Sequence, residues 1–382
     1  MNLISINTKQ KTFVILFFCS LLIGIKLGTL IPLLSLILES KGYSNLEIGI
    51  NTIAQPLATV LFVRITPKII HRFGLTKSLV VSQLIAIVLY FSFLFVEGLT
   101  AWFIIRFIIG FAGALAWNAF DTWMLTLADD TNRGKVVATY NMVFAIGFAI
   151  GPAVIGFTGL EGSLPFITIA LISFIVIIPM LTLRVEAPQL SEHRPIPVLL
   201  AVIAAPTIFG AAILMGLEDV MFVSFFPIYL IKSGFTYDAA LNYVTISLAG
   251  GVLAQPLIGY LLDKYNKRSI LNILVVIVFI SPIVLHYSLD NFIITVISLV
   301  AWGASGAGLF ATGLTMLGER YETSQVASAT AVFVMVFEVG SVSGPLIGGK
   351  VMDIQGPSGF ILTISVLTFL FLMVSLYRTI RK

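Results

Sequence analysis

The sequence predicts an all-α membrane protein with twelve transmembrane helices in two six-helix bundles related by a pseudo-two-fold axis. Composition, apolar segments and an internal repeat carry this prediction. Of the 382 residues, 58% are apolar and only 10% are charged, whereas soluble domains carry about 25% charged residues. One bilayer crossing needs roughly 20 apolar residues, so this length accommodates about a dozen crossings. The composition excludes a soluble enzyme, a secreted disulfide scaffold and a disordered chain.

Twelve apolar segments follow one another, separated by glycine, proline and polar residues. Their approximate ranges are 12–38, 46–70, 77–96, 99–128, 136–157, 164–183, 200–231, 239–262, 270–288, 292–318, 326–349 and 358–377. We expect helices because an unclosed sheet leaves its backbone unsatisfied in lipid. A polar, proline-containing stretch at 184–197 predicts a cytoplasmic linker. It would join an N-terminal six-helix bundle at 1–183 to a C-terminal one at 198–382.

The positions of the 22 lysines and arginines predict the orientation. If both termini lie on one side, three basic residues fall on the other side, and Lys26 and Arg106 lie inside helices. The remaining seventeen share the side of the termini: Lys9, Lys11, Arg64, Lys68, Arg72, Lys77, Arg133, Lys135, Arg184, Arg194, Lys264, Lys267, Arg268, Arg320, Arg378, Arg381 and Lys382. Basic residues concentrate in cytoplasmic loops. We therefore expect a multi-pass protein of the cell membrane, the inner membrane in a bacterium, with both termini cytoplasmic and no nucleic-acid partner.

Catalytic and metal-binding chemistry has no support in the sequence. The single cysteine, Cys19, allows no intramolecular disulfide and argues against structural zinc. The three histidines form no metal-spaced cluster, and no catalytic triad or phosphate-binding Gly-Lys-Thr loop is present. We expect no enzymatic activity, no catalytic residue, no metal and no cofactor.

The two halves of the chain repeat each other. Sliding 110–156 onto 303–349, an offset of 193, makes twelve of 47 positions identical. They are Gly110, Gly113, Ala114, Thr122, Ala138, Met142, Val143, Phe144, Gly147, Gly151, Pro152 and Gly156. An offset of 192 pairs Gly42 with Gly234 and Lys26 with Glu218. Parallel repeats of six helices are typical of transporters in which two bundles rock against each other.

Several motifs resemble those of the major facilitator superfamily. The stretch Gly259-Tyr-Leu-Leu-Asp263-Lys264-Tyr-Asn-Lys267-Arg268 is close to its signature loop Gly-x-Leu-x-Asp-Arg-x-Gly-Arg-Arg. In the first-half copy, Pro67 and His71 replace the glycine and the aspartate, so an Asp-based cytoplasmic latch is not expected there. Arg106-x-x-x-Gly110-x-x-Gly113 is similar to the helix-4 arginine motif. The resemblance implies a twelve-helix transporter with gating residues at Asp263 and Arg268.

A glycine–proline motif occurs once in each half. Gly147-x-x-x-Gly151-Pro152-x-x-x-Gly156 resembles the motif of drug–proton antiporters, and Gly344-Pro345 lies in its second-half echo. Small residues four apart also let helices pack closely, so gating by Gly151, Pro152, Gly344 and Pro345 and ordinary packing both remain open. Asp121-Thr-Trp-Met, with Asn132-Arg-Gly and Tyr140, resembles the YcaD-like branch of the superfamily.

Six ionisable residues fall inside the expected helices and are the candidates for substrate binding or proton coupling. They are Lys26, Arg106, Asp121, Glu218, Asp219 and Glu338. A charge at a helix centre costs at least ~2.5–3.5 kcal/mol on insertion scales. The resemblance places Lys26 and Glu218/Asp219 on helices that face a central cavity. There they would bind substrate or exchange protons, or would form a structural ion pair.

The remaining candidates also have two readings. Asn118 and Asp121 share one helix face, which suits either a polar contact surface beside Trp117 or, for Asp121, a cytoplasmic gate. Arg106 lies 15 residues before Asp121. It either takes part in the coupling of transport, as its resemblance to the helix-4 motif implies, or extends to the outer interface. Glu338 either takes part in proton transfer or bonds a neighbouring helix.

These observations predict a secondary transporter that moves a small organic molecule by alternating access, as a monomer in the lipid bilayer. We expect proton-coupled efflux. The alternatives are a proton symporter or facilitator for uptake of a nutrient or organic anion, and, from another class, a non-transporting membrane receptor or scaffold.

Overall fold

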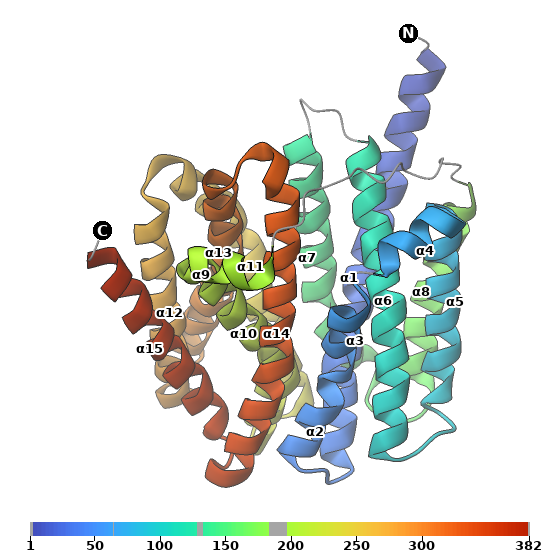
Figure 1. The fold of residues 1–382 in the computed structure, drawn as a ribbon. Helices are drawn as coiled ribbons and strands as arrows, with labels where there is room; N and C mark the ends of the chain where they lie inside the picture. Colours follow the sequence, from blue (N-terminus) through green and yellow to red (C-terminus); the bar gives the residue numbers. More distant parts are fainter. Residues whose placement is uncertain (1–2, 64, 128–132, 183–196, 381–382) are drawn as a thin grey trace. The chain divides into compact units, whose positions relative to one another are not determined.

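The computed structural model describes residues 3–63, 65–127, 133–182 and 197–380, and in these residues the chain forms fifteen helices (Figure 1). In chain order they are α1 (Leu3–Ser40), α2 (Asn45–Thr52), α3 (Ala54–Phe62), α4 (Thr66–Phe73), α5 (Leu75–Ser92), α6 (Leu99–Leu127), α7 (Arg133–Thr158), α8 (Leu164–Thr182), α9 (Val198–Ala204), α10 (Pro206–Lys232), α11 (Tyr237–Lys264), α12 (Lys267–Tyr287), α13 (Phe292–Arg320), α14 (Thr323–Gln355) and α15 (Gly359–Ile380).

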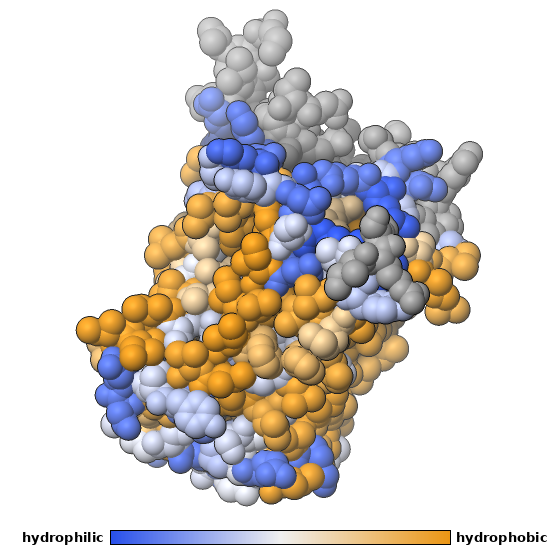
Figure 2. Space-filling model, turned by 90° about the vertical axis from the view of Figure 1, so that its left-hand side faces the viewer, coloured by the Kyte–Doolittle hydropathy of each residue, from blue (hydrophilic) through white to orange (hydrophobic). Residues whose placement is uncertain are grey.

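The described helices have the length and apolarity of membrane spans. Eleven of them pass both criteria, and the broken segment α2–α4 brings the number to twelve if it is one span. Figure 2 shows the face that carries α12 and α15, where hydrophobic side chains cover the middle and hydrophilic ones gather at the two ends. Exposed residues of these helices include Ile273, Ile280, Leu362 and Phe369. Such a surface suits contact with lipid.

Two expected segments are broken, and proline explains the breaks. The segment expected at 46–70 consists of three helices, with α4 bent by 67° from the helices before it. Pro56 cannot donate to the Thr52 carbonyl, where α2 ends, and Pro67 lies in the first turn of α4. The segment expected at 200–231 is interrupted at Ala205, directly before Pro206, so that α9 is a separate short helix.

Two features expected from the sequence lie largely outside the described residues. Of the linker expected at 184–197, only Pro197 is described, and it precedes α9. The side chains of the motif Asn132-Arg133-Gly134 are also outside the described part of the chain.

By its internal contacts the chain divides into two compact units. The first contains Met1–Ile37 and Ala54–Ser191, and the second contains Leu38–Ile53 and Glu192–Lys382. In the first unit α5 packs on α8 and α3 packs on α6. In the second, the most extensive packing is α10 on α14 and α11 on α13, and α2 also packs on α14.

Glycines bring corresponding helices together in both units. A Cβ atom on Gly24 of α1 would meet the α7 backbone, and one on Gly147 of α7 would meet the α1 backbone. The same contact recurs in the second unit between Gly216 of α10 and Gly340 of α14. Since Gly24 and Gly216 differ by 192 and Gly147 and Gly340 by 193, the sequence repeat corresponds to a repeated packing contact.

Candidate functional site

Glu218 lies at the middle of α10, in the interior of the second unit, and is 5% exposed. The Trp302 indole Nε1 of α13 donates a hydrogen bond to its Oε1. Its second oxygen, Oε2, is buried and has no hydrogen-bond partner among the described residues. Gly306 of α13 leaves room beside the carboxylate, because a Cβ atom there would lie 3.9 Å from Oε1. Of the two carboxylate oxygens, only Oε1 is therefore fixed by a hydrogen bond from a described residue.

Aromatic rings surround this hydrogen bond. Phe222 and Phe226, one and two turns after Glu218 on α10, pack edge-on against the Trp302 ring at centroid distances of 5.0 and 5.9 Å. Phe360 of α15 also contacts Trp302, at 6.1 Å. These contacts fix the orientation of the indole and keep the surroundings of the carboxylate apolar.

Two further carboxylates lie near Glu218 in the same unit. Asp219 follows it on α10, and Glu338 lies at the middle of α14, close enough to Asp219 for their charges to interact. Both side chains are partly buried. No ion pair between any of the three carboxylates and a lysine or arginine occurs within the described residues. An uncompensated buried carboxylate is costly, and proton binding removes its charge.

The hydrogen-bond partner of Lys26 is a glutamine, whereas the sequence suggested an ion pair with Glu218 or Asp219 as one possibility. It is 6% exposed in the first unit, and its Nζ donates to Gln83 Oε1 of α5 at 2.7 Å. A neutral amide oxygen stabilises an ammonium group but does not cancel its charge. Lys26 is therefore a buried amino group whose hydrogen-bond acceptor is neutral.

Arg106 is fully buried in the first unit. Its Nη2 lies 3.4 Å from Gln55 Oε1 of α3, so the side chain extends into the bundle and not to the outer interface. The contact has a counterpart in the second unit, where Ser247 Oγ donates to the Leu299 carbonyl at 3.0 Å. The repeat pairs Arg106 with Leu299 and Gln55 with Ser247. The fold therefore tolerates an uncharged residue at the position of Arg106.

Asp121 joins α6 to α7. Tyr140 of α7 and Trp117, one turn earlier on α6, are hydrogen-bond partners of its carboxyl group. Trp117 also packs edge-on against Phe144 at 4.8 Å. Asp121, Tyr140 and Trp117 thus form one cluster near the carboxyl end of α6.

The repeat gives this cluster an entirely apolar counterpart. The residues equivalent to Trp117, Asp121 and Tyr140 are Phe310, Leu314 and Phe333. Phe310 packs edge-on against Phe333 at 5.5 Å and against Phe337, the equivalent of Phe144, at 5.7 Å. Helix packing alone does not require a carboxylate here.

Asn118 belongs to a separate contact. Its Nδ2 donates to Thr66 Oγ1 of α4 at 2.8 Å and to the Ala114 carbonyl at 3.0 Å. The neighbouring Thr122 hydroxyl donates to the Asn118 carbonyl at 2.7 Å. Asn118 thus connects α6 to α4, whereas Asp121 connects α6 to α7.

Most of the residues expected to gate lie inside or between helices of their own units, and Asp263 is the exception. A Cβ atom on Gly151 would meet Gly28, and one on Gly344 would meet Leu217, while Pro152 and Pro345 lie inside α7 and α14. Arg268 Nε donates to Thr379 Oγ1 of α15 at 2.9 Å. Asp263 is exposed near the end of α11.

Sequence reasoning missed the neutral partners Trp302, Gln83 and Gln55. The repeat could have pointed to Trp302. Its equivalent in the first half is Ile109, which has no hydrogen-bond donor in its side chain, so the two halves differ in chemistry at this position. Within the described residues, no group of three or more histidine, cysteine, aspartate or glutamate side chains is arranged to hold a metal ion.

Comparisons with known proteins place these features in context. The profile described as Major Facilitator Superfamily matches residues 16–288 and 208–382. The Bacillus subtilis (strain 168) protein named uncharacterized MFS-type transporter YfkF is 24% identical over 340 residues, 86% of each chain. The Shigella flexneri protein named uncharacterized MFS-type transporter YcaD is 23% identical over 374 residues, 97% of this chain and 96% of that one.

A solved structure shows the same fold. The crystal structure of a mutant of the nucleoside transporter NupG superposes with a TM-score of 0.81 over 97% of this chain and 99% of that one, at 18% identity.

Proposed function

Because the chain belongs to the major facilitator superfamily, it is a multi-pass secondary transporter and not an enzyme, and from this premise we propose that it exports a small organic molecule in exchange for protons. In this proposal it works as a monomer in a bacterial inner membrane with both termini in the cytoplasm. The bundles 1–183 and 198–382 alternate access to a central binding site.

The environment of Glu218 is the observation that carries the proton coupling. One oxygen accepts from Trp302, and the other is buried without a partner among the residues that the structure describes. A permanently ionised group in this position would lack the compensation that buried charges need. A group that takes up and releases a proton during transport needs an apolar environment in one state and access to water in the other. Glu218 is therefore our candidate for the main proton carrier.

Asp219 and Glu338 give the proton a second position. Their charges interact, so ionisation of one disfavours ionisation of the other. Neither acid has an acidic equivalent in the first half, where Leu27 and Ala145 occupy the corresponding positions. The proton site is thus proposed for the second unit alone, and a proton shared within this trio would move when the bundles rock.

The first unit supplies the candidates for substrate contact. Lys26 would attract an anionic group, whereas Asp121, with Trp117 beside it, would attract a cationic one. Arg106 would link α6 to α3 through Gln55. Export is supported by the glycine–proline motif around Pro152, which resembles that of drug–proton antiporters.

Transport in reconstituted vesicles tests the proposal. A thermal-stability screen with organic cations, organic anions, sugars and nucleosides first identifies a ligand, whose labelled form is then followed. We expect a pH gradient, acidic on the side opposite the cytoplasmic face, to drive the ligand toward the acidic side. Movement that does not respond to the imposed gradient would refute proton coupling.

The buried position of Lys26 favours a second candidate function, which is the uptake of an organic anion together with protons. The buried Lys26 amino group donates to a neutral amide, so when protonated it is suited to attract a carboxylate or phosphate of a substrate. The same vesicles separate the two candidates. Accumulation on the cytoplasmic side with inward proton movement, lost in Lys26→Gln, would identify uptake and contradict export.

A further inference from the structure

A basic pocket lies at one end of the second unit, away from the carboxylates. It measures about 390 Å³. Its lining comes from the start of α10, the start of α12 and the end of α13, and consists of Ile208, Asn266, Lys267, Arg268, Met316, Glu319 and Arg320. A smaller adjoining pocket shares Arg268 and Arg320 and adds Arg378 of α15. Three arginines from three helices therefore meet at this end of the unit.

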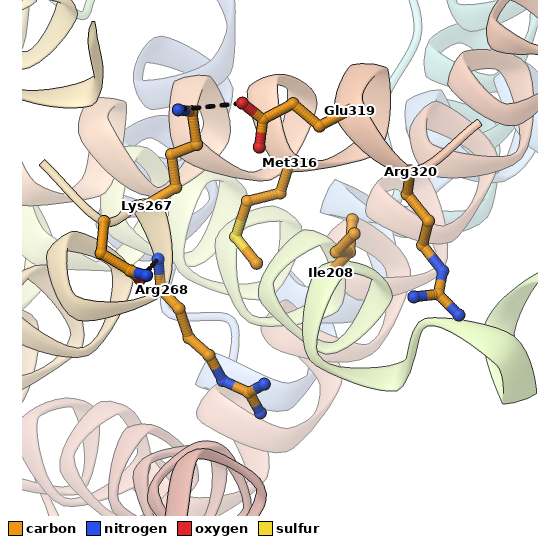
Figure 3. A pocket seen from close by; sticks show the side chains of 7 residues that line it. Ile208, Lys267, Arg268, Met316, Glu319 and Arg320 are labelled. Atoms are coloured by element: carbon orange, nitrogen blue, oxygen red, sulfur yellow. Dashed lines mark hydrogen bonds and ion pairs between the residues drawn. The ribbon is translucent and has the colours of Figure 1, made fainter. Parts of the chain in front are cut away.

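One acidic residue in the pocket is already neutralised. Lys267 Nζ lies 2.9 Å from Glu319 Oε1. Figure 3 shows that Lys267 extends toward Glu319, whereas the guanidinium groups of Arg268 and Arg320 extend away from this pair. Within the described residues, no carboxylate forms an ion pair with Arg268, Arg320 or Arg378. The pocket thus has a positive charge that the described side chains leave unbalanced.

Arg268 carries an unused hydrogen-bond donor. Its Nε donates to Thr379, but its Nη2 is buried and has no partner within the part of the chain that the structure describes. Arg378 lies close enough for the two positive charges to repel each other. A buried donor without an acceptor and a pair of like charges are both unfavourable. An anion between them would relieve both.

Arg320 lies on the other side of the pocket and connects it to α9. Its Nη2 donates to the carbonyl of Ala204, the last residue of α9, at 2.6 Å. Leu199, Leu200 and Ile203 of the same short helix are largely exposed. An apolar surface therefore lies next to the cationic pocket.

We infer that this pocket binds a phosphate group, held between Arg268, Arg320 and Arg378. The planar guanidinium fork matches the oxygens of phosphate, and an anion there would accept from Arg268 Nη2. The exposed side chains of α9 would contact acyl chains, so an acidic phospholipid supplies the phosphate in this arrangement. A soluble phosphate would share the polar contacts but would leave α9 uncovered.

The thermal unfolding midpoint of the purified full-length protein in detergent tests this site. One arm adds phosphatidylglycerol or phosphatidylcholine, and the other adds inorganic phosphate or chloride at equal ionic strength. We expect phosphatidylglycerol to raise the midpoint more than phosphatidylcholine. Arg268→Gln and Arg320→Gln should each weaken the apparent affinity about tenfold, as expected for loss of one hydrogen bond to a charged group.

The matched control is Lys264→Gln, which removes an exposed positive charge near the pocket without altering its lining. It should respond as the wild type does. If Arg268→Gln fails to fold, Arg320→Gln alone still decides the test, because Arg320 is exposed and its replacement should not prevent folding. Stabilisation by inorganic phosphate alone, sensitive to both arginines, would support the site with a soluble anion as its source. Two results would overturn the proposal. In the first, phosphatidylglycerol stabilises the wild type and Arg320→Gln equally. In the second, the protein prefers neither phosphate over chloride nor the acidic lipid over the neutral one.

Discussion

The indole of Trp302 donates a hydrogen bond to one oxygen of Glu218, while the other oxygen of the same buried carboxylate has no partner in the described ranges of the chain. A hydrogen bond of this kind is stronger when the acceptor is ionised. Trp302 therefore stabilises the deprotonated form of the carboxylate without adding a positive charge. The unpaired oxygen remains available to a proton.

Replacing Trp302 with phenylalanine tests this contribution. The Trp302→Phe variant keeps an aromatic ring against Phe222 but loses the donor, so the ionised form of Glu218 becomes less stable. We expect the pH at which coupled transport is half-maximal to rise by about one unit. Transport measured across a range of pH gives this value. Trp102→Phe, which removes a hydrogen bond to the Val96 carbonyl in the other unit, should leave the pH profile unchanged.

Replacing Gly340 with alanine tests the close packing of α10 on α14. The added methyl group would meet the backbone at Ile213 and Leu217, which cannot move independently of its helix. We expect a loss of about 2 kcal/mol or more in stability, measured as a lower thermal unfolding midpoint. Gly113→Ala is the control, since nothing lies within 4 Å of a Cβ atom there. Equal midpoints for the two variants would show that the contact does not limit stability.

Asp121→Leu tests whether the cluster near the end of α6 serves transport or packing. Leucine is the residue at the equivalent position of the second unit, Leu314, so the helices should still pack. We expect a folded protein, with an unfolding midpoint close to that of the wild type, and a loss of at least about tenfold in transport rate. Unfolding of Asp121→Leu would instead assign the carboxylate a structural role, and wild-type transport would exclude it from the mechanism.

Asp353 of α14 caps the amino end of α2. Its Oδ1 accepts from the Asn45 backbone N–H at 2.8 Å, and its Oδ2 accepts from the Leu46 N–H at 2.9 Å. A carboxylate at a helix amino end contributes about 1 kcal/mol, so Asp353→Ala should lower the unfolding midpoint by a corresponding amount. Asp290→Ala, which removes an exposed acid elsewhere, should not. A midpoint unchanged in Asp353→Ala would show that the cap is dispensable.

Much of the fold could be predicted from the sequence because lipid imposes strict demands on the backbone and on composition. Long apolar segments and the repeat predicted the helices and their correspondence. The breaks at Ala205 and around Pro56 were missed. Proline inside a membrane helix is tolerated in some positions, as at Pro152 and Pro345, and the sequence alone does not separate these cases.

The candidate site was predicted only in part. Charged residues in apolar segments are conspicuous, so Glu218 and Lys26 could be identified. Their partners Trp302 and Gln83 are neutral and depend on how each helix is rotated about its axis, which the sequence does not determine. Comparing the two halves helps to find such partners. A polar side chain whose equivalent is apolar, such as Trp302 against Ile109, is a candidate because packing alone does not require it.

Comparison of exchange and gradient-driven transport in the Glu218→Gln variant tests the central claim most directly. Glutamine keeps the shape and can accept from Trp302, but it cannot release a proton. We predict that Glu218→Gln vesicles still exchange labelled for unlabelled ligand across the membrane but no longer accumulate it in response to a pH gradient, whereas Asp290→Asn vesicles do both. Accumulation by Glu218→Gln equal to that of the wild type would contradict the assignment of Glu218 as the proton carrier.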